Sequence, residues 1–214
     1  ARFGGGMFAL LAPLQLLVLC SLASVGAAIS VSQEKDRRTL ILLLMTRLSG
    51  FEIVVGKLAA TLLAPLSLLL CGLPLFLALP LIGGVSPQQV FGVFAVTLAS
   101  VLLAGSAGTV VGLWREKTFQ AIALTVLLVL AYIGLGEIAA AAGWAERWVL
   151  AVSPPRALLA AASPMATLSP ATASGVFWFV VVAGAVAAAV LAGGVARVRI
   201  WNPSREVRLR AGEE

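Results

Sequence analysis

The chain contains 214 residues with a mass of 22.0 kDa; 61% of them are hydrophobic, only 11% are charged, and the mean hydropathy is +1.06. Because soluble domains carry about 25% charged residues, this composition excludes a water-soluble globular domain. The net charge of +6 comes without a single histidine, which excludes a Ser-His-Asp triad and a His-ligated metal centre.

Five apolar stretches follow one another along the chain, and each is long enough to cross a bilayer as a helix, which takes about 20 residues. The predicted spans cover approximately residues 7–31, 56–81, 88–113, 118–142 and 174–196. Gly83 and Gly84, followed by Pro87, predict that the second and third spans form a tight helical hairpin. The sequence therefore predicts an all-α polytopic helical membrane protein, with a single transmembrane domain over residues 1–200 and a tail over residues 201–214.

Basic residues lie mostly in the connections on one side of the predicted spans. That side collects twelve of the fifteen Lys and Arg residues, namely Lys35, Arg37, Arg38, Arg47, Lys57, Arg115, Lys117, Arg197, Arg199, Arg205, Arg208 and Arg210. Arg2, Arg147 and Arg156 lie on the other side. The positive-inside rule predicts that the first group and the C-terminal tail are cytoplasmic, in the cell (inner or plasma) membrane. This topology accounts for the positive charge, so we expect membrane lipid, and no nucleic acid, as a partner.

The same orientation places residue 1 outside, and the chain does not begin with Met. We therefore expect a six-span protein of which this sequence carries five spans. The alternative is that residues 1–29 are a secretory signal peptide. Cleavage there would place Lys35, Arg37 and Arg38 outside, against the charge distribution.

Residues 32–55 connect the first two spans on the cytoplasmic side and carry the most specific pattern. The apolar run from Leu40 to Met45 is too short to span a bilayer, and basic residues flank it on both sides. Such a helix suits a hydrophobic groove on a partner protein or the lipid interface, and the residues alone leave both open. Ser49 and Glu52 have the spacing of a capping box, which predicts that a new helix starts there and continues into the second span.

This stretch resembles the intracellular coupling segment of ABC type-2 exporter permeases, whose pattern is approximately E-K-E-R-G-T-L-E-x-L-L-x-T-P-L-S-x-x-E-I-x-x-G-K. The matching residues are Glu34, Lys35, Arg37, Thr39, Leu40, Leu43, Leu44, Thr46, Leu48, Ser49, Glu52, Ile53, Gly56 and Lys57. The chain departs from the pattern at Arg38, Ile41 and Arg47, where the family has Gly, an acidic residue and Pro. The order of the later spans resembles the family over most of the chain.

The resemblance implies that the segment docks on an ATP-binding subunit and transmits its closure to the spans. The residues that it assigns to this coupling are Glu34, Lys35, Arg37, Thr39, Leu40, Leu43, Leu44, Leu48, Ser49, Glu52 and Lys57. It further implies a second permease copy, as a homo- or heterodimer, and ATP with Mg²⁺ in the partner subunit, with no cofactor and no enzymatic activity in this chain. The run from Gly50 to Leu58 is no Walker A loop, because five rather than four residues separate its glycines and no Ser or Thr follows its lysine.

Small residues recur at every fourth position in two of the predicted spans. These stripes are Ser100, Ala104, Gly108 and Gly112 in the third span, and Gly184, Ala188 and Ala192 in the fifth. Because small residues let helix backbones approach closely, we expect both stripes to pack within the chain, with a dimer seam as the alternative.

Glu137 is an acidic residue near the outer end of the fourth span, and an acid within a span is a functional candidate. It is a candidate for a translocation path or an external gate; the alternative is an acid without such a role, because solvation is cheap close to the outer headgroups. The outer loop that follows, residues 143–173, is mostly apolar and interrupted by prolines. It predicts two short helical pieces, which suit re-entrant half-helices packed against protein. The permease family carries such helices before its last span as an extracellular gate.

The leading interpretation is the transmembrane permease subunit of an ATP-driven exporter. A channel or secondary transporter needs intramembrane charges or polar clusters, of which the sequence offers only Glu137. A membrane-embedded enzyme needs a catalytic set, and without histidine or paired carboxylates the sequence lacks one. A membrane assembly scaffold without ATP coupling is the other alternative.

Overall fold

The computed structural model describes residues 2–36, 50–115, 117–163 and 170–201. In chain order, its helices are α1 (Arg2–Asp36), α3 (Gly50–Ile82), α4 (Pro87–Trp114), α5 (Thr118–Ala141), α6 (Glu146–Val152), α7 (Pro154–Ala162) and α8 (Pro170–Trp201). Within these residues, five helices (α1, α3, α4, α5 and α8) are long and apolar enough to cross a membrane. The chain is thus a multi-pass helical membrane protein, and the predicted all-helical class is confirmed at this level.

The long helices start and end close to the predicted spans but extend beyond several of them. α1 is 35 residues long, so the first span continues without a break into residues 32–36. α3 begins at Gly50, well before the apolar part of the second span. Hydropathy marks the lipid-facing length of a helix, whereas the helix itself continues into water as long as its backbone hydrogen bonds are satisfied.

The predicted hairpin between the second and third spans is confirmed. Gly83 and Gly84 turn the chain with φ of 97° and 90°, a region that glycine adopts without steric cost. The Ser86 hydroxyl accepts the backbone N–H of Gln89 at 3.3 Å, and the Gln89 side chain accepts that of Ser86 at 2.7 Å. This capping box starts α4 with Pro87 in its first turn.

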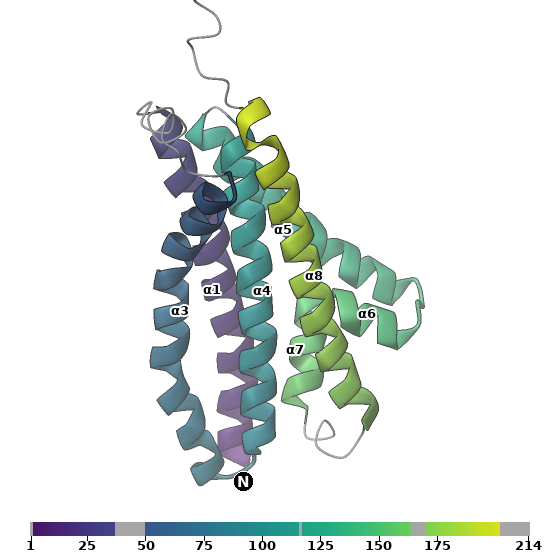
Figure 1. The fold of residues 1–214 in the computed structure, drawn as a ribbon. Coiled ribbons are helices and arrows are strands. Elements are labelled where there is room, and N and C mark those ends of the chain that lie inside the picture. The colour runs from purple at the N-terminus through teal and green to yellow at the C-terminus, as the bar shows by residue number, and fades with distance from the viewer. Residues whose placement is uncertain (1, 37–49, 116, 164–169, 202–214) are drawn as a thin grey trace, which may run out of the picture.

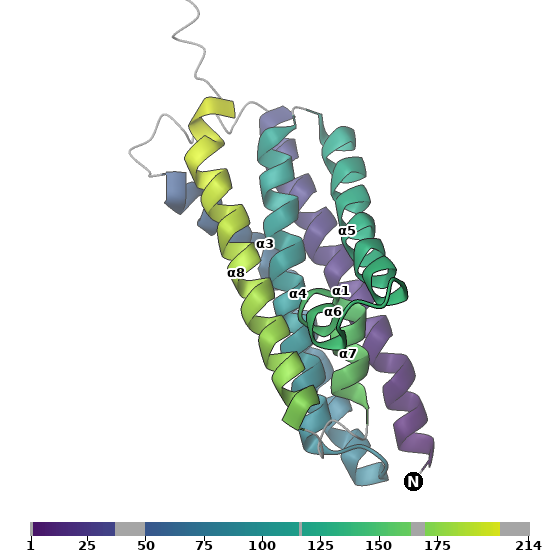
Figure 2. The ribbon, with the colours of Figure 1, turned by 90° about the vertical axis from the view of Figure 1, so that its right-hand side faces the viewer.

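Helix α4 is the centre of the bundle and packs along α1 (Figures 1 and 2). The two backbones come close where α4 carries glycine. A Cβ atom on Gly108 would lie 2.2 Å from the carbonyl oxygen of Ser24, and one on Gly112 would lie 3.0 Å from Cβ of Val31. The small-residue stripe of the third span therefore packs within the chain, as predicted.

The same prediction is wrong for the stripe of the fifth span. Gly184, Ala188 and Ala192 are exposed on α8, and a Cβ on Gly184 would meet nothing within 4 Å. Helix α8 instead buries the face that carries Phe179 and Ala183. A small-residue spacing shows which face allows a close approach, but it does not show which helix comes near.

The end of α5 leans away from the bundle, and α6 projects beside it (Figures 1 and 2). Helices α6 and α7 have seven and nine residues, too few to cross a bilayer. Helix α7 packs back against α4, because the Gln89 side chain donates to the carbonyl oxygen of Ala162 at 2.9 Å and Cβ of Ala161 lies 3.4 Å from a Cβ placed on Gly92. The region between α5 and α8 thus supplies one projecting and one inserted short helix.

Candidate functional site

Basic side chains gather at one end of the bundle. The ends of α1, α4 and α8 and the starts of α3 and α5 meet there, at the top of Figure 1. Lys35, Lys57, Arg115, Lys117 and Arg197 belong to these helix ends. The predicted gathering of basic connections on one side is confirmed for the described residues.

An ion pair joins α1 to α3 at this end. The Lys57 ammonium group donates to the Glu34 carboxylate, and the two side chains are only 17% and 32% exposed. The partners lie 23 residues apart in the chain, at the two ends of the pattern from Glu34 to Lys57 that resembles the coupling segment. A partly buried ion pair therefore holds together the end of α1, where the segment begins, and the start of α3, where it ends.

Lys35, the next residue on α1, binds the end of α4. Its ammonium group donates to the carbonyl oxygens of Leu113 and Arg115, the latter at 3.0 Å. The last carbonyl groups of a helix have no partner within the helix and carry partial negative charge, so a cation there is favourable. Two consecutive residues of α1 thus bond to two different helices.

The remaining residues assigned to coupling divide into two groups. Glu52 is exposed in the first turn of α3. Outside the described residues lie Arg37, Thr39, Leu40, Leu43, Leu44, Leu48 and Ser49, and with Ser49 the predicted capping box. The start of α3 at Gly50 agrees with a new helix at this point of the sequence.

Glu137 forms an ion pair with Arg156, which lies in the first turn of α7. Both carboxylate oxygens of Glu137 take part. Nε of Arg156 lies 3.1 and 3.0 Å from the two carboxylate oxygens, and Nη2 lies 2.6 Å from Oε2. The side chains are 42% and 44% exposed. Hydrogen bonding to Glu137 raises the pKa of Arg156, so the guanidinium group stays charged.

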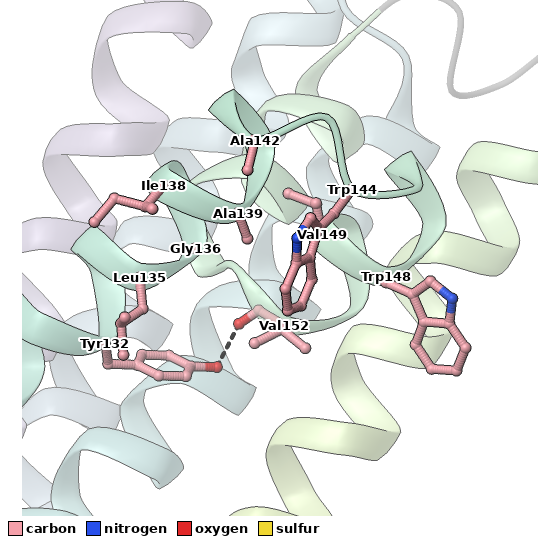
Figure 3. A pocket seen from close by; sticks show the side chains of 10 residues that line it. All are labelled: Tyr132, Leu135, Gly136, Ile138, Ala139, Ala142, Trp144, Trp148, Val149 and Val152. Carbon is pink, nitrogen blue, oxygen red and sulfur yellow. Dashed lines mark hydrogen bonds between the residues drawn. The ribbon is translucent and has the colours of Figure 1, made fainter.

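A pocket of about 740 Å³ lies between the second half of α5 and α6. On α5, the face that carries Tyr132, Gly136 and Ala139 lines it. Figure 3 shows Val149 and Val152 of α6 on its opposite wall and Trp148 at its edge. The Tyr132 hydroxyl donates to the carbonyl oxygen of Val152 across the pocket. Sequence reasoning missed this pocket. The spacing of Tyr132, Gly136 and Ala139 on one helix face was a visible signal, but nothing indicated that α6 faces it.

Comparison with models of protein families, with curated proteins and with solved structures returned no match. The resemblance of the segment around Glu34 and Lys57 to exporter permeases therefore stays a prediction from the sequence.

Proposed function

We propose that the chain is the transmembrane permease subunit of an ATP-driven exporter. The observation that carries the proposal is the coupling-segment pattern from Glu34 to Lys57, which begins and ends on two residues that form an ion pair. A segment that receives force from a partner needs firm attachment to the helices that it moves. The pair between α1 and α3, together with the bonds of Lys35 to α4, supplies such attachment.

The same bonds suggest how force reaches the spans. When two ATP-binding subunits close on ATP, the docked segment is displaced, and three helix ends move with it because Glu34, Lys35 and Lys57 connect them. Helix α4 packs on α1, α3, α5, α7 and α8, so a shift of its cytoplasmic end is felt by each of these helices. Packed interfaces respond to such displacements by switching between discrete arrangements.

The proposal includes the location and the partners of the chain. We place it in the cell (inner or plasma) membrane with a cytoplasmic C-terminus, because the basic helix ends lie on one side. A second permease copy and two ATP-binding subunits complete the exporter, and ATP with Mg²⁺ belongs to those subunits. On this topology α6 and α7 are the outer re-entrant half-helices, and the Glu137–Arg156 pair belongs to the external gate.

The decisive test changes the leucines of the coupling segment in the full-length protein. We expect Leu43→Asp with Leu44→Asp to abolish co-purification of an ATP-binding subunit, because charged side chains cannot enter an apolar groove without losing their hydration. The measurement is recovery of a nucleotide-binding polypeptide, with its ATPase activity, from native membranes. The matched control, Leu43→Ile with Leu44→Ile, keeps the apolar surface and should retain the subunit. Equal recovery with the aspartate variant, inserted at normal level, would contradict the proposal and favour a channel or a scaffold.

Glu137→Gln tests the gate. The pair is well exposed, so we expect normal insertion and little change in melting temperature. If the pair holds the gate, the exporter carrying Glu137→Gln should show a changed transport rate in proteoliposomes, and Arg156→Gln should change it in the same direction. Unchanged transport in both variants would remove Glu137 from the functional residues.

A further inference from the structure

The pocket between α5 and α6 has walls that are fixed to each other. The hydrogen bond from Tyr132 to Val152 bridges them directly (Figure 3). Beside the pocket, Gly136 approaches the residue between α6 and α7 so closely that a Cβ on it would lie 2.8 Å from Cβ of Ser153. On the opposite face of α5, the Glu137–Arg156 ion pair ties the helix to α7. The pocket is therefore part of the packed fold and not a gap between unconnected helices.

The lining of the pocket suits hydrocarbon and little else. Its walls are alanine, valine, leucine, isoleucine and indole side chains, with Tyr132 as the sole side chain that carries a hydroxyl. That hydroxyl already donates to a backbone carbonyl. A polar ligand would lose its hydrogen bonds with water here and gain few in return, which is unfavourable. The volume of about 740 Å³ lies in the usual range of ligand pockets, about 300–1,000 Å³.

The mouth of the pocket faces the surroundings of the bundle. Gly136 and Val149 form its buried floor, whereas Leu135 and Trp148 at its rim are 65% and 60% exposed. Helix α5 is the least buried of the five candidate spans, and its end projects from the side of the bundle with α6 (Figures 1 and 2). The rim continues along α5 into the exposed side chain of Leu128, two helical turns away on the same face.

We propose that this pocket is a binding site for a hydrocarbon chain of a membrane lipid. The chain spans a membrane, so the medium that meets the apolar rim along α5 is lipid, and an acyl chain can enter sideways from the bilayer. Tyr132 and Trp148 are amphipathic aromatic side chains of the kind that anchor at membrane interfaces. The inference is independent of ATP coupling, because it uses only α5, α6 and their shared pocket.

The test uses Trp148 as a reporter in the full-length protein reconstituted in phosphatidylcholine bilayers with an increasing fraction of brominated acyl chains, which quench tryptophan on contact. One variant keeps only Trp148, with Trp114, Trp144, Trp178 and Trp201 replaced by Phe. A reference variant keeps only Trp178, which is similarly exposed at 56% on α8 but lies outside the pocket. We expect Trp148 to reach half of its quenching at a several-fold lower fraction of brominated lipid than Trp178.

Filling the pocket should remove this difference. Ala139→Phe places a ring in the cavity, and Ala142→Leu is a smaller filling variant in case the first does not fold; both positions line the pocket. Ala141→Phe is the matched control, because Ala141 is exposed on the same helix outside the lining. Equal quenching of Trp148 and Trp178 at every fraction, or a difference that survives filling, would overturn the proposal. Weaker quenching at Trp148 than at Trp178 would also overturn it and indicate that protein, such as a second copy, covers the pocket.

Discussion

Gly108→Ala is expected to lower the free energy of unfolding by about 2–3 kcal/mol. The added methyl group would lie 2.2 Å from the carbonyl oxygen and 3.0 Å from the carbonyl carbon of Ser24. Both are backbone atoms of α1, so no side chain can rotate out of the way. The α1 and α4 backbones must therefore move apart, although these two helices form the most extensive contact among the described helices. The neighbouring side chains of α1 and α4 then lose close packing. The measurement is unfolding of the full-length protein in mixed micelles, monitored by tryptophan fluorescence.

Gly184→Ala is the control for this prediction. A Cβ on Gly184 meets nothing within 4 Å, and alanine favours a helix over glycine by up to about 1 kcal/mol. The control should therefore be neutral or stabilising. If Gly108→Ala were as stable as this control, the close packing of α1 on α4 would be wrong.

The second large effect is expected at the ion pair between α1 and α3. Glu34→Gln and Lys57→Met should each destabilise the protein by about 1–3 kcal/mol, because each leaves a partly buried charge without this partner. The double variant should lose less free energy of unfolding than the two single variants lose together, because neither charge of the pair remains in it. Thermal unfolding of the four proteins of this cycle measures the coupling energy.

A charge swap tests whether the attraction between opposite charges is what joins α1 to α3 at this pair. Glu34→Lys with Lys57→Glu restores opposite charges between α1 and α3, so we expect it to recover most of the stability lost in the single variants. It should also recover ATP-dependent transport if the pair transmits force. The pair contributes nothing specific if the stability losses of the two single variants add up in the double variant and the swap is no more stable than either single variant.

Much of the fold could be predicted from the sequence, because its strongest signals are local. Charge-free runs of sufficient length identify the five long helices, and Gly83, Gly84 and Pro87 identify the turn between two of them. The α4 stripe of Gly108 and Gly112 identifies a face for close packing. Each of these predictions depends on neighbouring residues in one helix, where spacing and composition determine the outcome.

The parts that could not be predicted depend on which helices meet. Lys35 bonds to Arg115 across 80 residues of sequence, and nothing in the composition of either segment selects the other. The partner of Glu137 is Arg156, which lies 19 residues later on another helix, and nothing in the sequence around either residue selects the other. The α5–α6 pocket likewise requires two walls from different helices. Hydropathy shows only that these surfaces are apolar. It does not show which apolar face of one helix packs against which face of another.

The central place of α4 has a consequence for how the protein is made. Helices are synthesised in chain order, so α1 and α3 emerge before the helix on which both pack. Until residue 114 has left the ribosome, the face of α1 that carries Ser24 and Val31 lacks its native neighbour and must be sheltered by lipid or by the insertion machinery. In any nascent chain that ends before α4, α1 and α3 should therefore remain a loosely associated pair of hydrophobic helices, and quality-control proteases should recognise that intermediate.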